Sequence, residues 1–156
     1  MTYRIIDEPR PSGLSNYAVS PLAPLFCVIM FGAVIIWPWY AFNSIAFGSA
    51  TRRKELTLCA VAGLGGFVLS FVLVAISERI PEWTHPYLAL VQVAWKLGFA
   101  YALTDIQSRS FELYEYFGGR VRSGVAAFFV MLLVYILVRV AVPYSQLPEW
   151  VAVGLM

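Results

Sequence analysis

Long apolar runs dominate the pattern of hydrophobic and polar positions in this chain. Four of them contain no more than one formal charge each, and they cover residues 22–40, 56–77, 87–104 and 125–142. A bilayer core about 30 Å thick is crossed by roughly 20 residues of α-helix. The pattern therefore predicts an all-α integral membrane protein with four transmembrane helices in two antiparallel hairpins.

The apolar runs divide the chain into three parts. We expect a polar N-terminal tail at residues 1–21, a four-helix transmembrane domain at residues 22–142 and an interfacial C-terminal tail at residues 143–156. Between the first two runs, Ser49 or Thr51 is placed to cap the second helix.

The third helix is predicted to continue beyond the membrane. After Thr104, apolar residues recur at helical spacing as far as Phe117, and charged residues stand between them. We therefore expect a third helix that extends a few turns into the cytoplasm and ends at Gly118 and Gly119.

Composition supports the membrane class. The chain is 60% hydrophobic and 13% charged, with a mean hydropathy of +0.74, and these values lie outside the usual range of soluble domains. The net charge of +2 combines 11 basic with 9 acidic residues, a balance that does not favour a nucleic-acid partner. The predicted partners are the lipid bilayer and either another membrane protein or a second copy of the chain.

The N-terminal tail lacks the pattern of a cleaved signal peptide. Arg4 and Arg10 flank Asp7 and Glu8 before the first apolar run begins, whereas a signal needs a basic start, a short apolar core and a small-residue cleavage site. We therefore expect a multi-pass protein of a cell membrane, the bacterial inner membrane, with no cleaved signal.

Basic residues indicate the orientation. The connections after the first and third runs hold Arg52, Arg53, Lys54, Arg109, Arg120 and Arg122. Placing both connections in the cytoplasm puts these six basic residues inside and leaves three in the outer tail and loop. The positive-inside rule then places both termini outside. Trp37, Trp39 and Tyr40 are expected to mark the cytoplasmic boundary of the first helix.

A second topology stays open at the first run. Residues 36–47 are rich in aromatic side chains and are interrupted by Pro38. If this stretch forms a re-entrant turn instead of a helix end, the N-terminus lies in the cytoplasm.

Small residues form a stripe on the second predicted helix. Ala62, Gly66 and Ser70 are four residues apart, so they share a face that a neighbouring helix can approach closely. The alternative is the ordinary abundance of Gly and Ala in membrane helices.

Two cysteines lie in the apolar runs. Cys27 and Cys59 stand near the starts of successive antiparallel runs, which places them at opposite depths of the membrane. Because a disulfide needs Cα atoms within about 7 Å, we predict that both are small apolar side chains of the core.

Lys96 is the least expected residue in the apolar runs. It falls in the middle of the third run, where an ionised side chain costs at least about 2.5 kcal/mol. Gln92 lies four residues earlier on the same helical face. Three interpretations stay open: a neutral buried lysine, a lysine facing a wet interior, and a lysine that pairs with an acidic group of a partner. Gln92 and Lys96 are thus candidates for partner binding or for a polar pathway.

The sequence contains no motif for catalysis or cofactor binding. His85 is the single histidine, too little for a metal site, and the sequence contains no His-Glu-x-x-His, no Gly-x-Ser-x-Gly and no phosphate-binding glycine loop. We therefore predict no enzymatic activity, no catalytic residue, no cofactor and no metal.

Two functions are compatible with these observations. The first is a small non-enzymatic membrane protein that binds a membrane partner, either as an accessory subunit or as a toxin-immunity protein. The alternative is an oligomeric transporter or ion-pathway protein that uses Gln92 and Lys96.

Overall fold

The computed structural model describes residues 12–31, 33–142 and 147–155. Over these residues the chain is all-helical, and its elements are η1 (Ser15–Tyr17), α1 (Leu22–Phe31), α2 (Ala33–Phe47), α3 (Arg52–Ser77), η2 (Glu82–Thr84), α4 (His85–Tyr116), α5 (Gly124–Ala141) and α6 (Glu149–Leu155). Among the described residues, three segments are long and apolar enough to cross a membrane, namely α3, α5 and the helix formed by η2 and α4.

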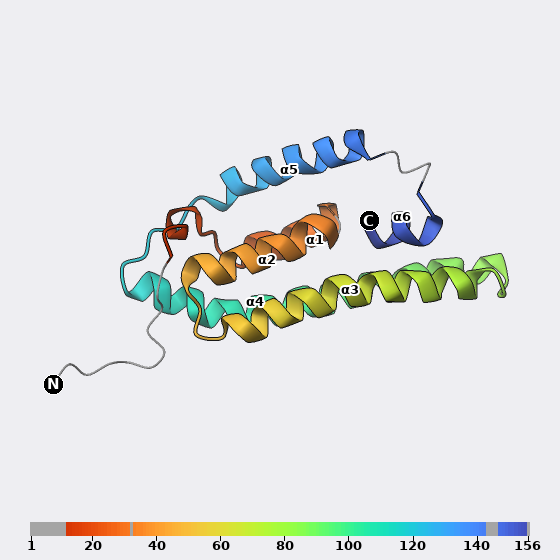
Figure 1. Cartoon of the computed structure of the whole chain (residues 1–156), viewed down its shortest axis with the longest axis horizontal. Coiled ribbons are helices and arrows are strands. Elements are labelled where there is room, and N and C mark those ends of the chain that lie inside the picture. The colour runs from red at the N-terminus through yellow and green to blue at the C-terminus, as the bar shows by residue number, and fades with distance from the viewer. Residues whose placement is uncertain (1–11, 32, 143–146, 156) are drawn as a thin grey trace.

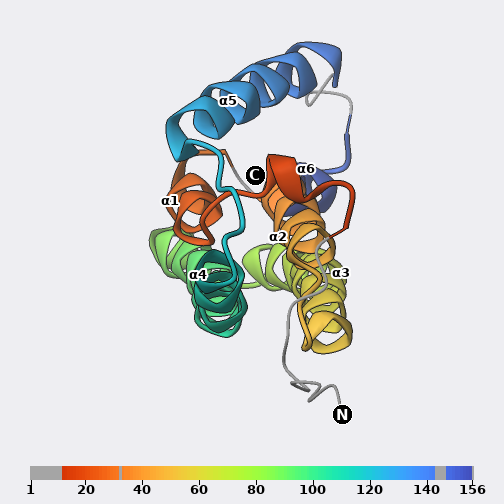
Figure 2. The same ribbon diagram turned by 90° about the vertical axis from the view of Figure 1, so that its left-hand side faces the viewer.

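The helices lie in three layers (Figure 1; Figure 2). α3 and α4 form a long antiparallel pair on one side, and α5 lies alone on the opposite side. Between them, α1, α2 and α6 fill the middle layer.

The first apolar run is not one helix, so the prediction of a single span at residues 22–40 is wrong. α1 and α2 run antiparallel as a hairpin, because Asn43 Nδ2 donates a hydrogen bond to the Val19 carbonyl at 3.1 Å. In one continuous helix these two residues would be about 36 Å apart. The hairpin also buries Tyr40, whose hydroxyl lies 2.7 Å from Thr104 Oγ1 of α4.

Both ends of this hairpin lie at one end of the molecule. The Ser12 amide donates to the Ala46 carbonyl at 3.3 Å, and the Arg122 amide donates to the Ala18 carbonyl at 3.0 Å. The segment before α1, the α2–α3 turn and the α4–α5 connection therefore gather there, and we call this the hairpin end. The predicted re-entrant turn at residues 36–47 is not formed, because these residues lie within α2, which continues through Pro38. The chain reverses between α1 and α2 instead.

A glycine turn ends the hairpin. Gly48 has φ of 64°, and the amides of Gly48 and Ser49 donate to the carbonyls of Ile45 and Ser44 at 3.2 and 3.3 Å. This is the Schellman pattern, which satisfies the last carbonyls of α2 and needs a residue without a Cβ. The chain then enters α3 at Arg52.

The predicted extension of the third helix beyond Thr104 is confirmed. α4 runs for 32 residues without interruption. It ends in a second Schellman pattern, because Gly118 has φ of 81° and the Gly119 amide donates to the Tyr114 carbonyl at 2.9 Å.

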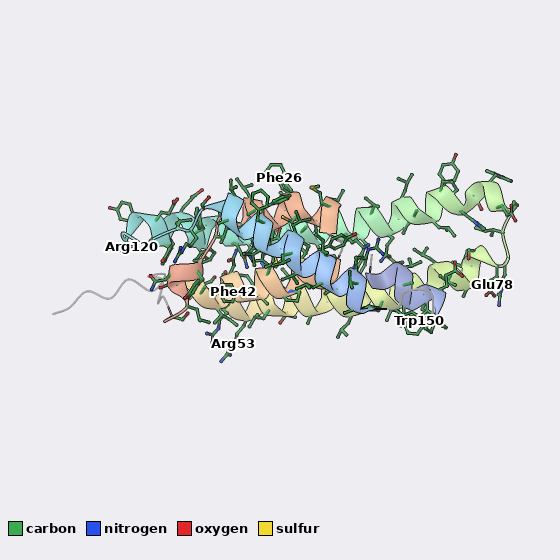
Figure 3. The ribbon with its side chains drawn as sticks, turned by 90° about the horizontal axis from the view of Figure 1, so that it is seen from above. Phe26, Phe42, Arg53, Glu78, Arg120 and Trp150 are labelled. Carbon is green, nitrogen blue, oxygen red and sulfur yellow. The ribbon has the colours of Figure 1, made fainter. Side chains whose placement is uncertain are left out.

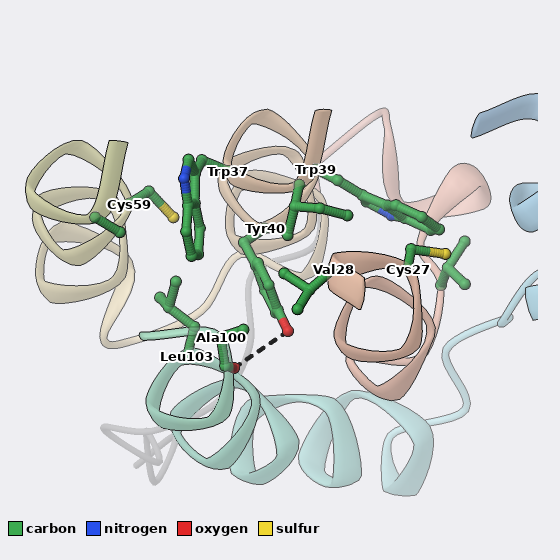
Figure 4. Packing of buried hydrophobic residues seen from close by; sticks show 11 residues of the cluster. Cys27, Val28, Trp37, Trp39, Tyr40, Cys59, Ala100 and Leu103 are labelled. Carbon is green, nitrogen blue, oxygen red and sulfur yellow. Dashed lines mark hydrogen bonds between the residues drawn. The ribbon is translucent and has the colours of Figure 1, made fainter. Parts of the chain in front are cut away.

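The main apolar core fills the space between the hairpin, α3 and α4. Trp37, Trp39 and Tyr40 are all buried there, so the prediction that they mark a membrane boundary is wrong. Cys27 and Cys59 are free, buried members of the same core (Figure 4). The predicted opposite depths are also wrong, because α1 and α3 both begin at the hairpin end.

The C-terminal segment folds back into the molecule. α6 packs along α3, where the Trp150 ring lies 5.9 Å from the Phe71 ring. Gly154 approaches α3 so closely that an added Cβ would lie 2.6 Å from Phe67 Cδ1. The described part of the C-terminal tail, residues 147–155, is therefore packed against the bundle, and its interfacial position stays a prediction.

Candidate functional site

The structure brings Gln92 and Lys96 to one small cavity. Residues of α2, α3, α4 and α6 line a partly open cavity of about 20 Å³, and both side chains contribute to its wall together with Trp37, Trp95 and Gly154. A cavity of this size accommodates one water molecule. Gln92 is buried at this cavity, whereas Lys96 is half-buried, and α6 contributes Gly154 to the lining.

Hydrogen bonds orient the Gln92 amide. The Ser70 hydroxyl donates to the Gly66 carbonyl at 2.8 Å, so its oxygen is left to accept a hydrogen bond from Gln92 Nε2 at 3.1 Å. This arrangement directs the amide nitrogen towards α3. The other amide atom, Gln92 Oε1, is buried and has no hydrogen-bond partner within the described structure.

Two tryptophans of the cavity differ in their hydrogen bonding. Trp95 Nε1 donates to the Ala62 carbonyl at 3.1 Å. Trp37 Nε1 is buried and has no hydrogen-bond partner in the described part of the chain. The cavity wall therefore contains a buried donor and a buried acceptor that are both unpaired.

The stripe of small residues faces these side chains. Ala62, Gly66 and Ser70 are buried on the face of α3 that meets α4. The closest approach is one residue away, however: a Cβ on Gly65 would lie 2.6 Å from Trp95 Cζ2, whereas a Cβ on Gly66 would lie 3.7 Å from Trp95 Nε1. Because the edge of the indole that carries Nε1 and Cζ2 meets α3, Gly65 is the position with the least space.

A buried carboxylate at the hairpin end was missed from the sequence. Glu55 is fully buried, and it accepts hydrogen bonds from the hydroxyls of Ser49 and Thr51 and, at 2.9 Å, from Gln107 Nε2. Thr51 precedes α3, but its side chain does not cap the helix. Neither hydroxyl therefore serves as the predicted cap, because both bind the carboxylate.

Gln107 extends this network to α2. Its amide nitrogen also donates to the Tyr40 carbonyl at 2.8 Å, so one side chain of α4 holds both α2 and α3. We call Ser49, Thr51, Glu55 and Gln107 the Glu55 cluster. Its hydroxyl and amide groups already occupy both carboxylate oxygens, which indicates a structural role.

A second feature missed from the sequence is an apolar groove beside α5. It has a volume of about 760 Å³ and lies between α5 and the hairpin. Its apolar walls include Ile35, Trp39, Phe42, Val130, Met131 and Val134. We call it the α5 groove. Helical periodicity could not reveal it, because the faces that line it come from helices far apart in the sequence.

A cation stands at one end of the α5 groove. Arg122 Nε donates to the Asn16 carbonyl at 3.2 Å, and its guanidinium lies 5.8 Å from the centre of the Tyr17 ring. Arg122, Tyr17 and Ser123 all line the groove, so its mouth at the hairpin end is polar and its interior is apolar.

Among the described residues, no group of three or more His, Cys, Asp or Glu side chains lies close enough together to hold a metal ion. Comparison of the chain with protein-family models, with curated proteins and with solved structures finds no match. The function is therefore inferred from the geometry of the molecule.

Proposed function

We propose that this chain is a non-enzymatic membrane protein that binds a transmembrane helix of a partner protein in the α5 groove, either as an accessory subunit or as a toxin-immunity protein. The observation that carries the proposal is the groove itself. Its volume of about 760 Å³ is within the usual range of binding sites. Its lining is almost wholly apolar, which suits the side chains of a helix inside a bilayer.

We propose a topology with three spans, α3, α4 and α5, and a re-entrant hairpin of α1 and α2. The described basic residues at the hairpin end are Arg52, Arg53, Lys54, Arg109, Arg120 and Arg122. The opposite end has only Arg79 and Arg139 among the described residues. Figure 3 shows Arg53 and Arg120 towards the hairpin end and Glu78 towards the other. The positive-inside rule favours a cytoplasmic hairpin end.

This topology removes a difficulty of the four-span arrangement. The four-span arrangement places Arg4 and Arg10 of the N-terminal tail outside the cell, which conflicts with the positive-inside rule. With a re-entrant hairpin, the chain that precedes α1 joins the basic connections on the cytoplasmic side.

A polar pathway through Gln92 and Lys96 is the alternative function. The unpaired polar atoms around their cavity favour it. The cavity of about 20 Å³ holds only one water molecule, so a pathway requires an oligomer or a displacement of α6. The α5 groove needs no such change, and partner binding is therefore the better-supported function.

Site-specific photo-crosslinking in the native membrane tests the proposal. Val130 lines the groove and Phe129 does not, yet their exposed fractions are nearly equal at 57% and 60%. A benzophenone amino acid at Val130 should give one discrete protein adduct, whereas the same group at Phe129 should give none. Mass spectrometry of the adduct distinguishes a toxin from a subunit of a membrane complex.

Two outcomes would contradict the proposal. Equal yields of protein adduct from Val130 and Phe129 would show that a partner contacts α5 without binding specifically in the α5 groove. Adducts with lipid alone from Val130 would make acyl chains the occupant of the α5 groove.

A further inference from the structure

The cavity beside Lys96 combines two unpaired buried groups of opposite character. Trp37 Nε1 is a hydrogen-bond donor and Gln92 Oε1 is an acceptor, and their residues are only 6% and 5% exposed. Both residues line the cavity, as does Lys96. Because buried polar groups in proteins almost always find a partner, these atoms point to a ligand that can both accept and donate hydrogen bonds.

The acceptor is oriented by its neighbours. The Ser70 hydroxyl already donates to the Gly66 carbonyl, so it accepts from Gln92 Nε2. A flipped amide would turn its oxygen towards the Gly66 carbonyl, which lies 3.5 Å from Nε2, and would place two acceptors against each other. Gln92 Oε1 therefore stays free to accept a hydrogen bond.

We infer that this cavity is a binding site for one water molecule, which accepts hydrogen bonds from Trp37 Nε1 and Lys96 Nζ and donates one to Gln92 Oε1. Its volume of about 20 Å³ fits one water, which needs two to four polar partners. A halide ion accepts from the same two donors but faces the negative end of the Gln92 amide, so water is the better ligand.

The water site changes the interpretation of Lys96. Its side chain gains a hydrogen-bond partner inside its own chain, at the place where α2, α3, α4 and α6 meet. An acidic group on another protein is then not required to stabilise it. The lysine contributes to the packing of the bundle, and the binding of a partner is left to other surfaces.

Nuclear magnetic resonance of the full chain in detergent micelles tests the site directly. The five tryptophans each give one indole N–H signal, and Trp→Phe variants assign them. The Trp37 indole proton should show a cross-peak to a long-lived water. The Trp95 proton should show none, because it donates to the Ala62 carbonyl. The cross-peaks are measured on the unmodified chain, and the Trp→Phe variants serve only to assign the signals.

Two controls define the outcomes. In Lys96→Met the Trp37 cross-peak should persist, because Trp37 and Gln92 remain as partners; its loss would mean that the signal came from ammonium protons and would overturn the water site. Replacing chloride by nitrate should leave the Trp37 shift unchanged. A shift would identify an anion as the ligand, and absence of the water cross-peak in the unmodified chain would also refute the inference.

Discussion

The hairpin and α5 are attached to the rest of the molecule in different ways. The hairpin is joined to α4 by the bonds of Tyr40 to Thr104 and of Gln107 to the Tyr40 carbonyl. α5 has no buried residue along its 18 positions and lies apart from α3 and α4 on the far side of the hairpin (Figure 2).

The difference shows where binding surface is available. Lipid tails are as apolar as the helices, so apolar surface alone gives little attraction between helices in a bilayer, and close packing with hydrogen bonds holds them together. The hairpin has both. α5 presents an apolar face over a groove of about 760 Å³, which leaves that face available to another helix.

The largest expected effect is a difference in labelling from outside the cell. If α1 and α2 form a hairpin, both of its ends lie on the same side of the membrane. An impermeant maleimide added to intact spheroplasts should label Glu82→Cys and leave Gly13→Cys and Ala50→Cys unlabelled until lysis. All three positions are exposed, and the native Cys27 and Cys59 are buried. Labelling of Gly13→Cys with protection of Ala50→Cys would restore the single first span.

Removing the buried carboxylate should strongly destabilise the hairpin end. In Glu55→Leu the donors of Ser49, Thr51 and Gln107 lose their acceptor, at about 1 kcal/mol or more for each. The free energy of unfolding, measured by titration with denaturing detergent, should fall by at least about 3 kcal/mol. The exposed Glu78→Leu is the control and should change it by less than about 0.5 kcal/mol. Similar losses of unfolding free energy in the two variants would show that the Glu55 cluster does not stabilise the hairpin end.

Matched leucines compare the two regions directly. Leu103 of α4 is fully buried, whereas Leu137 of α5 is 58% exposed. Leu103→Ala should lower the free energy of unfolding by about 2 to 5 kcal/mol through the cavity that it leaves, and Leu137→Ala should change it by about 0.5 kcal/mol or less. A large loss at Leu137 in detergent would show that α5 is as firmly packed as α4.

The smallest expected effect comes from two neighbouring glycines of α3, which differ in how closely they approach α4. Gly65→Ala forces a Cβ to within 2.6 Å of Trp95 Cζ2, and such overpacking should lower the melting temperature by an amount equivalent to about 1 to 3 kcal/mol. Gly66→Ala leaves 3.7 Å, and the better helix propensity of Ala offsets any cost by up to about 1 kcal/mol. If Gly66→Ala proved the more harmful, the stripe and not the indole contact would set the helix distance.

The polar anomaly of the site was visible in the sequence, but its partners were not. Gln92 and Lys96 stand out because any polar residue in an apolar run is unusual. Trp37 lies 55 positions before Gln92 and looks like an ordinary interfacial aromatic residue. Glu55 follows a basic turn and looks solvated, because its burial depends on Gln107, which α4 supplies.

The sequence by itself determined the membrane-helical class, the three long helices α3, α4 and α5, and the extension of α4 to its glycine end. These features are local, since the length of an apolar run and a glycine turn follow from neighbouring residues. Only the tertiary structure decided that the first apolar run is a hairpin and that α6 packs against α3. An apolar run has the same composition as one long helix or as two short ones, and the choice depends on hydrogen bonds and close contacts with residues far away in the chain, such as Val19 with Asn43.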